Sequence, residues 1–239
     1  MTPAVLKEGF DSEGRFFFDM EYIQGVTLAE YIKTMEIRKI RGLVTSLVEN
    51  MVPTEPRIAE KNGEAAINRC FLEKLDSLDA SLSGIENPHL MAAMKLLRKH
   101  NWCNVSASPC HGDLTLENII VHNDRLYLID FLDSFYDSWV MDMGTLLQDV
   151  QALWSYRKEP AISMNTVLRL MVFRDVLVDT VGAIDQKYQI EIYYALLLKL
   201  VRIYPYSKDY ATRQFLDEKL DQVMLRLQPV RKGKTWQER

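Results

Sequence analysis

The chain has 239 residues, of which 48% are hydrophobic and 26% are charged. This balance is typical of a folded globular protein and excludes disordered, collagen-like and low-complexity chains. The 29 basic and 33 acidic residues leave a formal net charge of −4, so we expect no nucleic acid partner. The length corresponds to one large domain or two unequal lobes.

The sequence predicts neither a membrane-spanning helix nor a secretory signal. Its most apolar window, residues 192–201, carries Lys199 and is shorter than the roughly 20 residues that a membrane helix needs. Charged side chains precede the apolar run near the amino terminus, which is unlike a signal peptide. Three cysteines without a C-x-x-C pair are too few for a disulfide scaffold. We therefore expect no membrane association and a cytoplasmic location.

The predicted elements begin with a little β structure and continue as a mostly helical body. Residues 15–23 are rich in aromatic side chains and predict a strand. The capping-box spacing of Thr27 and Glu30 predicts one helix over residues 27–52. Apolar residues at three- and four-residue steps predict further helices over residues 67–82, 88–102, 143–156, 163–181, 189–203 and 211–227.

The helical period disappears between residues 106 and 133. Residues 119–121 and 126–129 predict two short strands, with Asn123 and Asp124 as the turn of a hairpin between them.

Polar residues with the chemistry of phosphoryl transfer flank this hairpin. The sequence reads H-G-D-x-x-x-x-N before it, from His111 to Asn118, and I-D-F after it, around Asp130. Phosphoryl transfer needs oxygen ligands for Mg²⁺ and a carboxylate that accepts the proton of the attacking hydroxyl. Asp113 would be that base, while Asn118 and Asp130 would hold the metal. The alternative is that all three only cap and bend the chain, but their joint spacing favours the metal site.

This stretch resembles the protein-kinase-like superfamily, and within it the aminoglycoside phosphotransferase and choline kinase branch, whose loop reads H-G-D. Gly112 fits that branch. The resemblance extends by motif over residues 16–150. It implies an α+β, protein-kinase-like fold that consists mostly of the helical carboxyl-terminal lobe, with a small β-hairpin and a remnant of the amino-terminal lobe. The expected divisions are 1–25 for the remnant and interlobe linker, 26–228 for the helical lobe and 229–239 for a loose basic tail.

The resemblance also implies a nucleotide-binding set. The carbonyl of Glu21 and the amide of Ile23 would pair with adenine, and Ile120 and Ile129 would form the apolar floor beneath it. ATP and Mg²⁺ are the implied cofactors.

Three further residues would support the loop. Asp142 resembles the aspartate that buttresses the catalytic loop in this family. His111 would pack under the loop and hydrogen-bond the backbone. For Asp133 two roles stay open, binding a second metal ion or shaping the loop.

Two features depart from the family pattern. Only residues 1–18 precede the segment that resembles the linker, and no G-x-G-x-x-G phosphate loop occurs. Thr115 also replaces the histidine or lysine that the family often places near the γ-phosphate, and a hydroxyl adds no positive charge. An incomplete first lobe would leave apolar surface for self-association or for a partner that supplies the missing part.

The expected function is ATP- and Mg²⁺-dependent transfer of a phosphoryl group to a hydroxyl of a small molecule, such as a sugar, an aminoglycoside or a choline-like metabolite. The alternative is a truncated or degenerate kinase-like protein that acts as a non-catalytic binding or scaffold module. Tyr136, Trp139, Trp154 and Tyr156 are expected in the core or the cleft wall, with an aromatic cage for a quaternary ammonium as the other reading.

Overall fold

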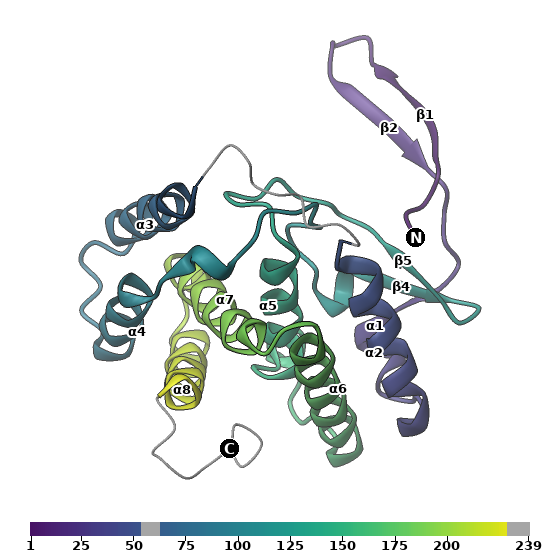
Figure 1. Ribbon diagram of the computed structural model, residues 1–239. Helices are drawn as coiled ribbons and strands as arrows, with labels where there is room; N and C mark the ends of the chain where they lie inside the picture. Colours follow the sequence, from purple (N-terminus) through teal and green to yellow (C-terminus); the bar gives the residue numbers. More distant parts are fainter. Residues whose placement is uncertain (54–62, 229–239) are drawn as a thin grey trace.

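The computed structural model describes residues 1–53 and 63–228 (Figure 1). Its strands are β1 (Val5–Phe10), β2 (Phe16–Met20), β3 (Val26–Thr27), β4 (Ile119–His122) and β5 (Arg125–Leu128). Its helices are α1 (Leu28–Tyr31), α2 (Ile37–Met51), α3 (Glu64–Ser81), α4 (Pro88–Lys99), α5 (Trp139–Val150), α6 (Met164–Ile184), α7 (Lys187–Ile203) and α8 (Tyr210–Leu227). Short 3-10 turns lie at Trp102–Asn104, Leu116–Asn118, Trp154–Tyr156 and Tyr204–Tyr206. The basic tail predicted at residues 229–239 lies outside the described residues.

The strands form two small antiparallel sheets. β1 and β2 make a ribbon that stands away from the helical body (Figure 1). β3, β4 and β5 make the second sheet, with β4 in the middle. The predicted hairpin is confirmed, because Asn123 and Asp124 join β4 to β5 with φ angles of 48° and 56° that suit a tight two-residue turn. β1 has no counterpart among the predicted strands because charged residues and a glycine interrupt its sequence.

The helix predicted over residues 27–52 is wrong as a single element. The Thr27 hydroxyl does accept the N–H of Glu30 at 3.3 Å, but α1 is only one turn long and α2 starts after a separate turn. On one continuous helix the buried side chains of Leu28 and Val44 would face different directions. The break lets both apolar faces reach the core.

The helix predicted over residues 143–156 is displaced. α5 begins earlier because the Ser138 hydroxyl caps it by accepting the N–H of Val140 at 3.3 Å. It ends before Leu153, which has a left-handed φ of 62°. The remaining long helices lie within a few residues of their predicted positions.

α5 and α7 form the centre of the core (Figure 1). Every residue of α5 is buried, and so are residues 191–201 of α7. The two helices approach closely because Gly144 of α5 lies against Ala195, where a side chain would overlap. This packing fixes the end of α7 relative to the loops around the β4–β5 hairpin. In the described part of the chain, no helix combines the length and the apolar character that crossing a membrane requires.

Candidate active site

The loop that carries the H-G-D motif is held by a buried carboxylate of α5. Asp142 accepts the backbone N–H of His111 at 2.6 Å and that of Gly112 at 3.0 Å. Burial raises the pKa of Asp142 to about 6, against the opposing effect of these two N–H donors. The ionised form of Asp142 therefore braces the two peptide groups that flank His111.

The same loop is tied to the segment that follows β5. Gly112 has a left-handed φ of 87°, and a Cβ there would overlap the carbonyl oxygen of Leu132. The N–H of Leu132 donates to the carbonyl of His111 at 3.0 Å. The His111 ring stacks on Phe131 and its Nε2–H donates to the carbonyl of Ile129 at 2.8 Å. Burial lowers the pKa of His111, so a neutral ring makes these contacts.

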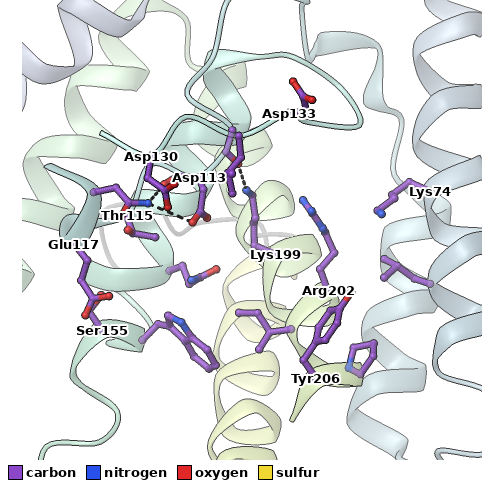
Figure 2. Close-up of a pocket in the computed structure, with 18 of the residues that line it drawn as sticks. Lys74, Asp113, Thr115, Glu117, Asp130, Asp133, Ser155, Lys199, Arg202 and Tyr206 are labelled. Atoms are coloured by element: carbon purple, nitrogen blue, oxygen red, sulfur yellow. Dashed lines mark hydrogen bonds between the residues drawn. The ribbon is translucent and has the colours of Figure 1, made fainter. Parts of the chain in front are cut away.

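Asp113, Asn118 and Asp130 line one part of a shared cleft. The side chains of Asp113 and Asp130 both point into this part of the cleft (Figure 2), and both carboxylates act electrostatically on the His111 ring. The Nδ2 atom of Asn118 donates to the backbone carbonyl of Asp113 at 2.9 Å, which leaves the amide oxygen for another partner. Asp130 has a left-handed φ of 61°, a strained conformation that is typical of functional positions.

The chemistry of this set fits a magnesium ion. Two carboxylates and one amide oxygen are hard oxygen donors, the kind that Mg²⁺ prefers. Within the described ranges no three His, Cys, Asp or Glu side chains gather closely enough to hold an ion by themselves. The amide oxygen of Asn118 would serve as a ligand beside the carboxylate of Asp130.

A second buried carboxylate, which the sequence motifs did not indicate, positions Asn118. Asp149 of α5 accepts the N–H of Leu116 at 2.7 Å, at the start of the 3-10 turn that ends with Asn118. It also accepts the hydroxyl of Ser155 at 2.7 Å. Its nearly complete burial raises its pKa to about 6. The only sequence signal for this role was an acidic residue within a mostly apolar helix.

The cleft has a volume of about 660 Å³, within the range of small-molecule pockets. Asp133 also lines it but lies apart from Asp113 and Asp130 (Figure 2). The lining residues come from α3, the H-G-D loop, the segment after β5, the ends of α5 and α7 and the 3-10 turns that follow these two helices. They are Lys74, Ser77, Leu78, Ser81, Gly112, Asp113, Thr115, Glu117, Asn118, Asp130, Leu132, Asp133, Gln148, Trp154, Ser155, Lys199, Arg202, Ile203, Pro205 and Tyr206.

The residues predicted to bind the nucleotide base lie outside this cleft lining. Glu21 and Ile23 lie on the connection between β2 and β3, Ile120 lies in β4, and Ile129 directly follows β5. Ile120 pairs with Thr27 and Tyr127 in the second sheet. The part of the four predicted residues in binding adenine stays a prediction.

Three basic side chains in the cleft escaped the sequence motifs. Lys199 of α7 donates to the carbonyl of Gly112 at 3.0 Å, and burial lowers its pKa to about 8. Arg202 follows on the same face of α7, and Lys74 faces it from α3 (Figure 2). The sequence signal was the isolated Lys199 within a strongly apolar window, since a buried charge normally needs a partner.

The aromatic cage considered from the sequence is not formed. Of the four candidate aromatic residues only Trp154 lines the cleft, and the Arg157 guanidinium stacks on its ring at 3.7 Å. Trp139 and Tyr156 are buried in the core, and the Tyr136 hydroxyl donates to the carbonyl of Val105.

Comparison with known proteins gives a family match and a shared fold. A model of the phosphotransferase enzyme family matches residues 2–164. No curated protein matches the sequence significantly. Among solved structures, glucosamine kinase in complex with glucosamine, ADP and inorganic phosphate is similar, with a TM-score of 0.58, 12% identity, and coverage of 95% of this chain and 64% of that one.

A second similar structure is the GDP complex of wild-type aminoglycoside 2'-phosphotransferase-IIIa. Its TM-score is 0.57 at 17% identity, covering 94% of this chain and 76% of that one. The chain spans only 66% and 64% of two glucosamine kinase structures that it matches. At these identities the likeness establishes the fold, and it confirms the fold class that the sequence predicts.

Proposed function

We propose that this chain, which belongs to the phosphotransferase enzyme family, uses ATP and Mg²⁺ to phosphorylate a hydroxyl group of a small molecule. The observation that carries the proposal is the meeting of Asp113, Asn118 and Asp130 in one part of a cleft of ligand size. Together they offer an acceptor for a hydroxyl proton beside a set of oxygen ligands, which are the parts that phosphoryl transfer requires.

Asp113 would orient the acceptor hydroxyl and accept its proton. Its backbone is restrained from two sides, because Asn118 donates to its carbonyl and Asp142 holds the preceding residue, Gly112. A base held in this way keeps its carboxylate where the hydroxyl must bind, and such positioning supplies much of the rate enhancement in this reaction class.

Asn118 and Asp130 would hold Mg²⁺ through the amide oxygen and the carboxylate. When bound, the ion would neutralise negative charge on the phosphates. Asp149 supports this role indirectly, since it fixes the turn that ends with Asn118.

Lys199 would supply the positive charge that Thr115 does not. Its ammonium group donates to Gly112 beside Asp113, close to where the transferred phosphoryl group would lie. Because the charge comes from α7 rather than from the loop, a neutral residue at position 115 is compatible with turnover.

ATP is the proposed nucleotide, with Glu21, Ile23, Ile120 and Ile129 as its base-binding residues. The similar structures support nucleotide use, since one is described with ADP and another with GDP. We place the reaction in the cytoplasm, as expected from the composition and the few cysteines.

Removing the proposed base while leaving the loop intact tests the function. The full chain is incubated with ATP, Mg²⁺ and a panel of hydroxyl compounds, and ADP and phosphorylated products are followed by phosphorus NMR. Asp113→Asn should lower the transfer rate about 10²- to 10⁴-fold, the usual contribution of a general base. Asp137→Asn, which removes an exposed carboxylate outside the cleft lining, should leave the rate unchanged.

Transfer that survives Asp113→Asn undiminished would contradict the assignment of the base. No product from any acceptor, together with no consumption of ATP, would favour the non-catalytic binding module.

A further inference from the structure

We infer that the acceptor is an anionic hydroxyl compound, one that carries a carboxylate or a phosphate group a few bonds from the hydroxyl that is phosphorylated. The inference rests on the proposed function, because it names the class of molecule that would occupy the cleft beside Asp113. It is carried by two basic side chains, Arg202 and Lys74, at the end of the cleft away from Asp130 (Figure 2).

Arg202 and Lys74 come from different helices and face the same space. Both are half-buried, and both charged groups lie over the ring of Phe135, at 5.6 Å for Arg202 and 5.7 Å for Lys74. The helices that carry them are far apart in sequence, so the fold itself brings the two charges together.

Neither cation is paired with a carboxylate at contact distance in the described part of the chain, although Asp113 acts electrostatically on Arg202. No hydrogen bond or ion pair is formed by Arg202 or Lys74 there, whereas Lys33 and Arg98 each contact two carboxylates. Half-buried like charges that face each other without an ion pair are unfavourable, and an anion between them would relieve the cost. Burial lowers the pKa of both groups, and the charge of Arg202 lowers that of Lys74 further.

The position of the two cations suits an acceptor that spans the cleft. Lys199 lies one helical turn before Arg202 and contacts the H-G-D loop, so the basic face of α7 runs from Asp113 toward Lys74 (Figure 2). A molecule whose hydroxyl lies at Asp113 would place its far end at Arg202. A guanidinium there binds carboxylates and phosphates with two parallel hydrogen bonds.

At the end of the cleft formed by Arg202 and Lys74 the same charges disfavour a cationic group, although carboxylates also line the cleft, at Asp113, Glu117, Asp130 and Asp133. An amino sugar or a quaternary ammonium would bring a positive charge toward Arg202 and Lys74, and Trp154, the aromatic residue of the cage candidates that lines the cleft, already stacks with Arg157. The chain would thus differ in substrate charge from the glucosamine kinase whose fold it shares.

The test compares four hexose derivatives of similar size: gluconate, glucose 6-phosphate, glucose and glucosamine. Binding of each compound to the full chain is measured by calorimetry, with and without Mg²⁺ and a non-hydrolysable ATP analogue. The analogue occupies the γ-phosphate position, so an anion that still binds in its presence binds in the acceptor position. At least one anionic compound should bind about tenfold or more tightly than glucose, and glucosamine should bind most weakly. The carboxylate and phosphate arms show which anion is preferred.

Variants test whether Arg202 and Lys74 cause the preference for an anionic compound. Arg202→Ala and Lys74→Ala should each reduce the preference for the anion, while affinity for glucose and for the nucleotide analogue stays unchanged. Arg69→Ala removes an exposed charge from the same helix as Lys74, outside the cleft lining, and should have no effect. Circular dichroism checks that each variant is folded.

Equal or tighter binding of glucose or glucosamine, binding of none of the four compounds, or a preference that survives both variants would overturn the inference. If Arg202→Ala loses nucleotide binding but keeps the preference for the anion, Arg202 binds the γ-phosphate instead. That result would also overturn the inference. A separate result would contradict the proposed function itself, namely the absence of Mg²⁺-dependent nucleotide binding, whichever of the four compounds bind.

Discussion

A side chain at Gly112 would collide with the carbonyl oxygen of Leu132, so the H-G-D loop and the segment after β5 can approach only because residue 112 is a glycine. Gly112 also has a left-handed φ of 87°, which costs an alanine about 1 kcal/mol. Gly112→Ala should therefore lower the free energy of unfolding by about 2–4 kcal/mol, strain and overlap combined, measured by urea denaturation.

Gly84→Ala is the matched control for that change. Gly84 has a similar φ of 84° but open space around its Cβ position, so alanine there should cost only the conformational strain of about 1 kcal/mol. Equal losses in the two variants would mean that contact with Leu132 is unimportant.

Asp142→Asn keeps the size of the side chain but removes its negative charge, so it tests whether the carboxylate braces the loop through its two hydrogen bonds. An amide can accept one of the two N–H groups from His111 and Gly112 but presents its own donor to the other. We expect a loss of about 1–3 kcal/mol in unfolding free energy and, because the base is displaced, about a 10²-fold loss in kcat/KM. Asp179→Asn, an exposed position on α6, controls for the loss of a charge. Full activity of Asp142→Asn would disprove the bracing role.

The activity should have a bell-shaped pH dependence. Asp142, with its pKa near 6, ionises as the pH rises and then accepts both N–H groups of the loop, so kcat/KM should increase through about pH 6. Lys199, with its pKa near 8, loses its positive charge beside Asp113 at higher pH, so activity should fall through about pH 8. Lys199→Arg should move the alkaline limb upward, because a guanidinium stays protonated. An alkaline limb that does not move would rule out Lys199 as its origin.

The raised pKa of Asp149 predicts a free energy of unfolding that falls as the pH rises. Its pKa is near 6 in the folded chain and near 3.8 in the unfolded chain, so between these values the folded state binds the extra proton. Raising the pH from about 4 to 6 should therefore lower the free energy of unfolding, on the order of 3 kcal/mol for this group, with no further change above 6. Urea denaturation of Asp149→Asn across this range should give a smaller decrease than the parent chain. An identical slope in the variant would exclude Asp149 as the source.

The local motifs of the sequence predicted which residues the H-G-D loop brings together, because these residues lie close together along the chain. The spacing of Asp113 and Asn118 fits one loop, and the hairpin turn at Asn123 and Asp124 brings Asp130 back to it. The turn and the pairing of β4 with β5 produce this return. The role of Asp142, which lies much further along the chain, was implied only by the family resemblance.

The basic side of the cleft could not be predicted in that way. Lys74 and Arg202 meet only because α3 and α7 pack around the same core, and no local pattern encodes that meeting. The break between α1 and α2 could not be predicted for a related reason. Leu28 and Val44 are both buried, but the direction in which each helix turns its apolar face depends on the elements that it packs against.

Calorimetric titration of ATP with and without Mg²⁺ would show whether Asn118 and Asp130 hold one ion beside Asp113. We expect ATP to bind to the full chain in the presence of Mg²⁺, with a metal dependence that is lost in Asp130→Ala and kept in Asp137→Ala. Binding that is equally strong without Mg²⁺, or that is unchanged in Asp130→Ala, would contradict this expectation.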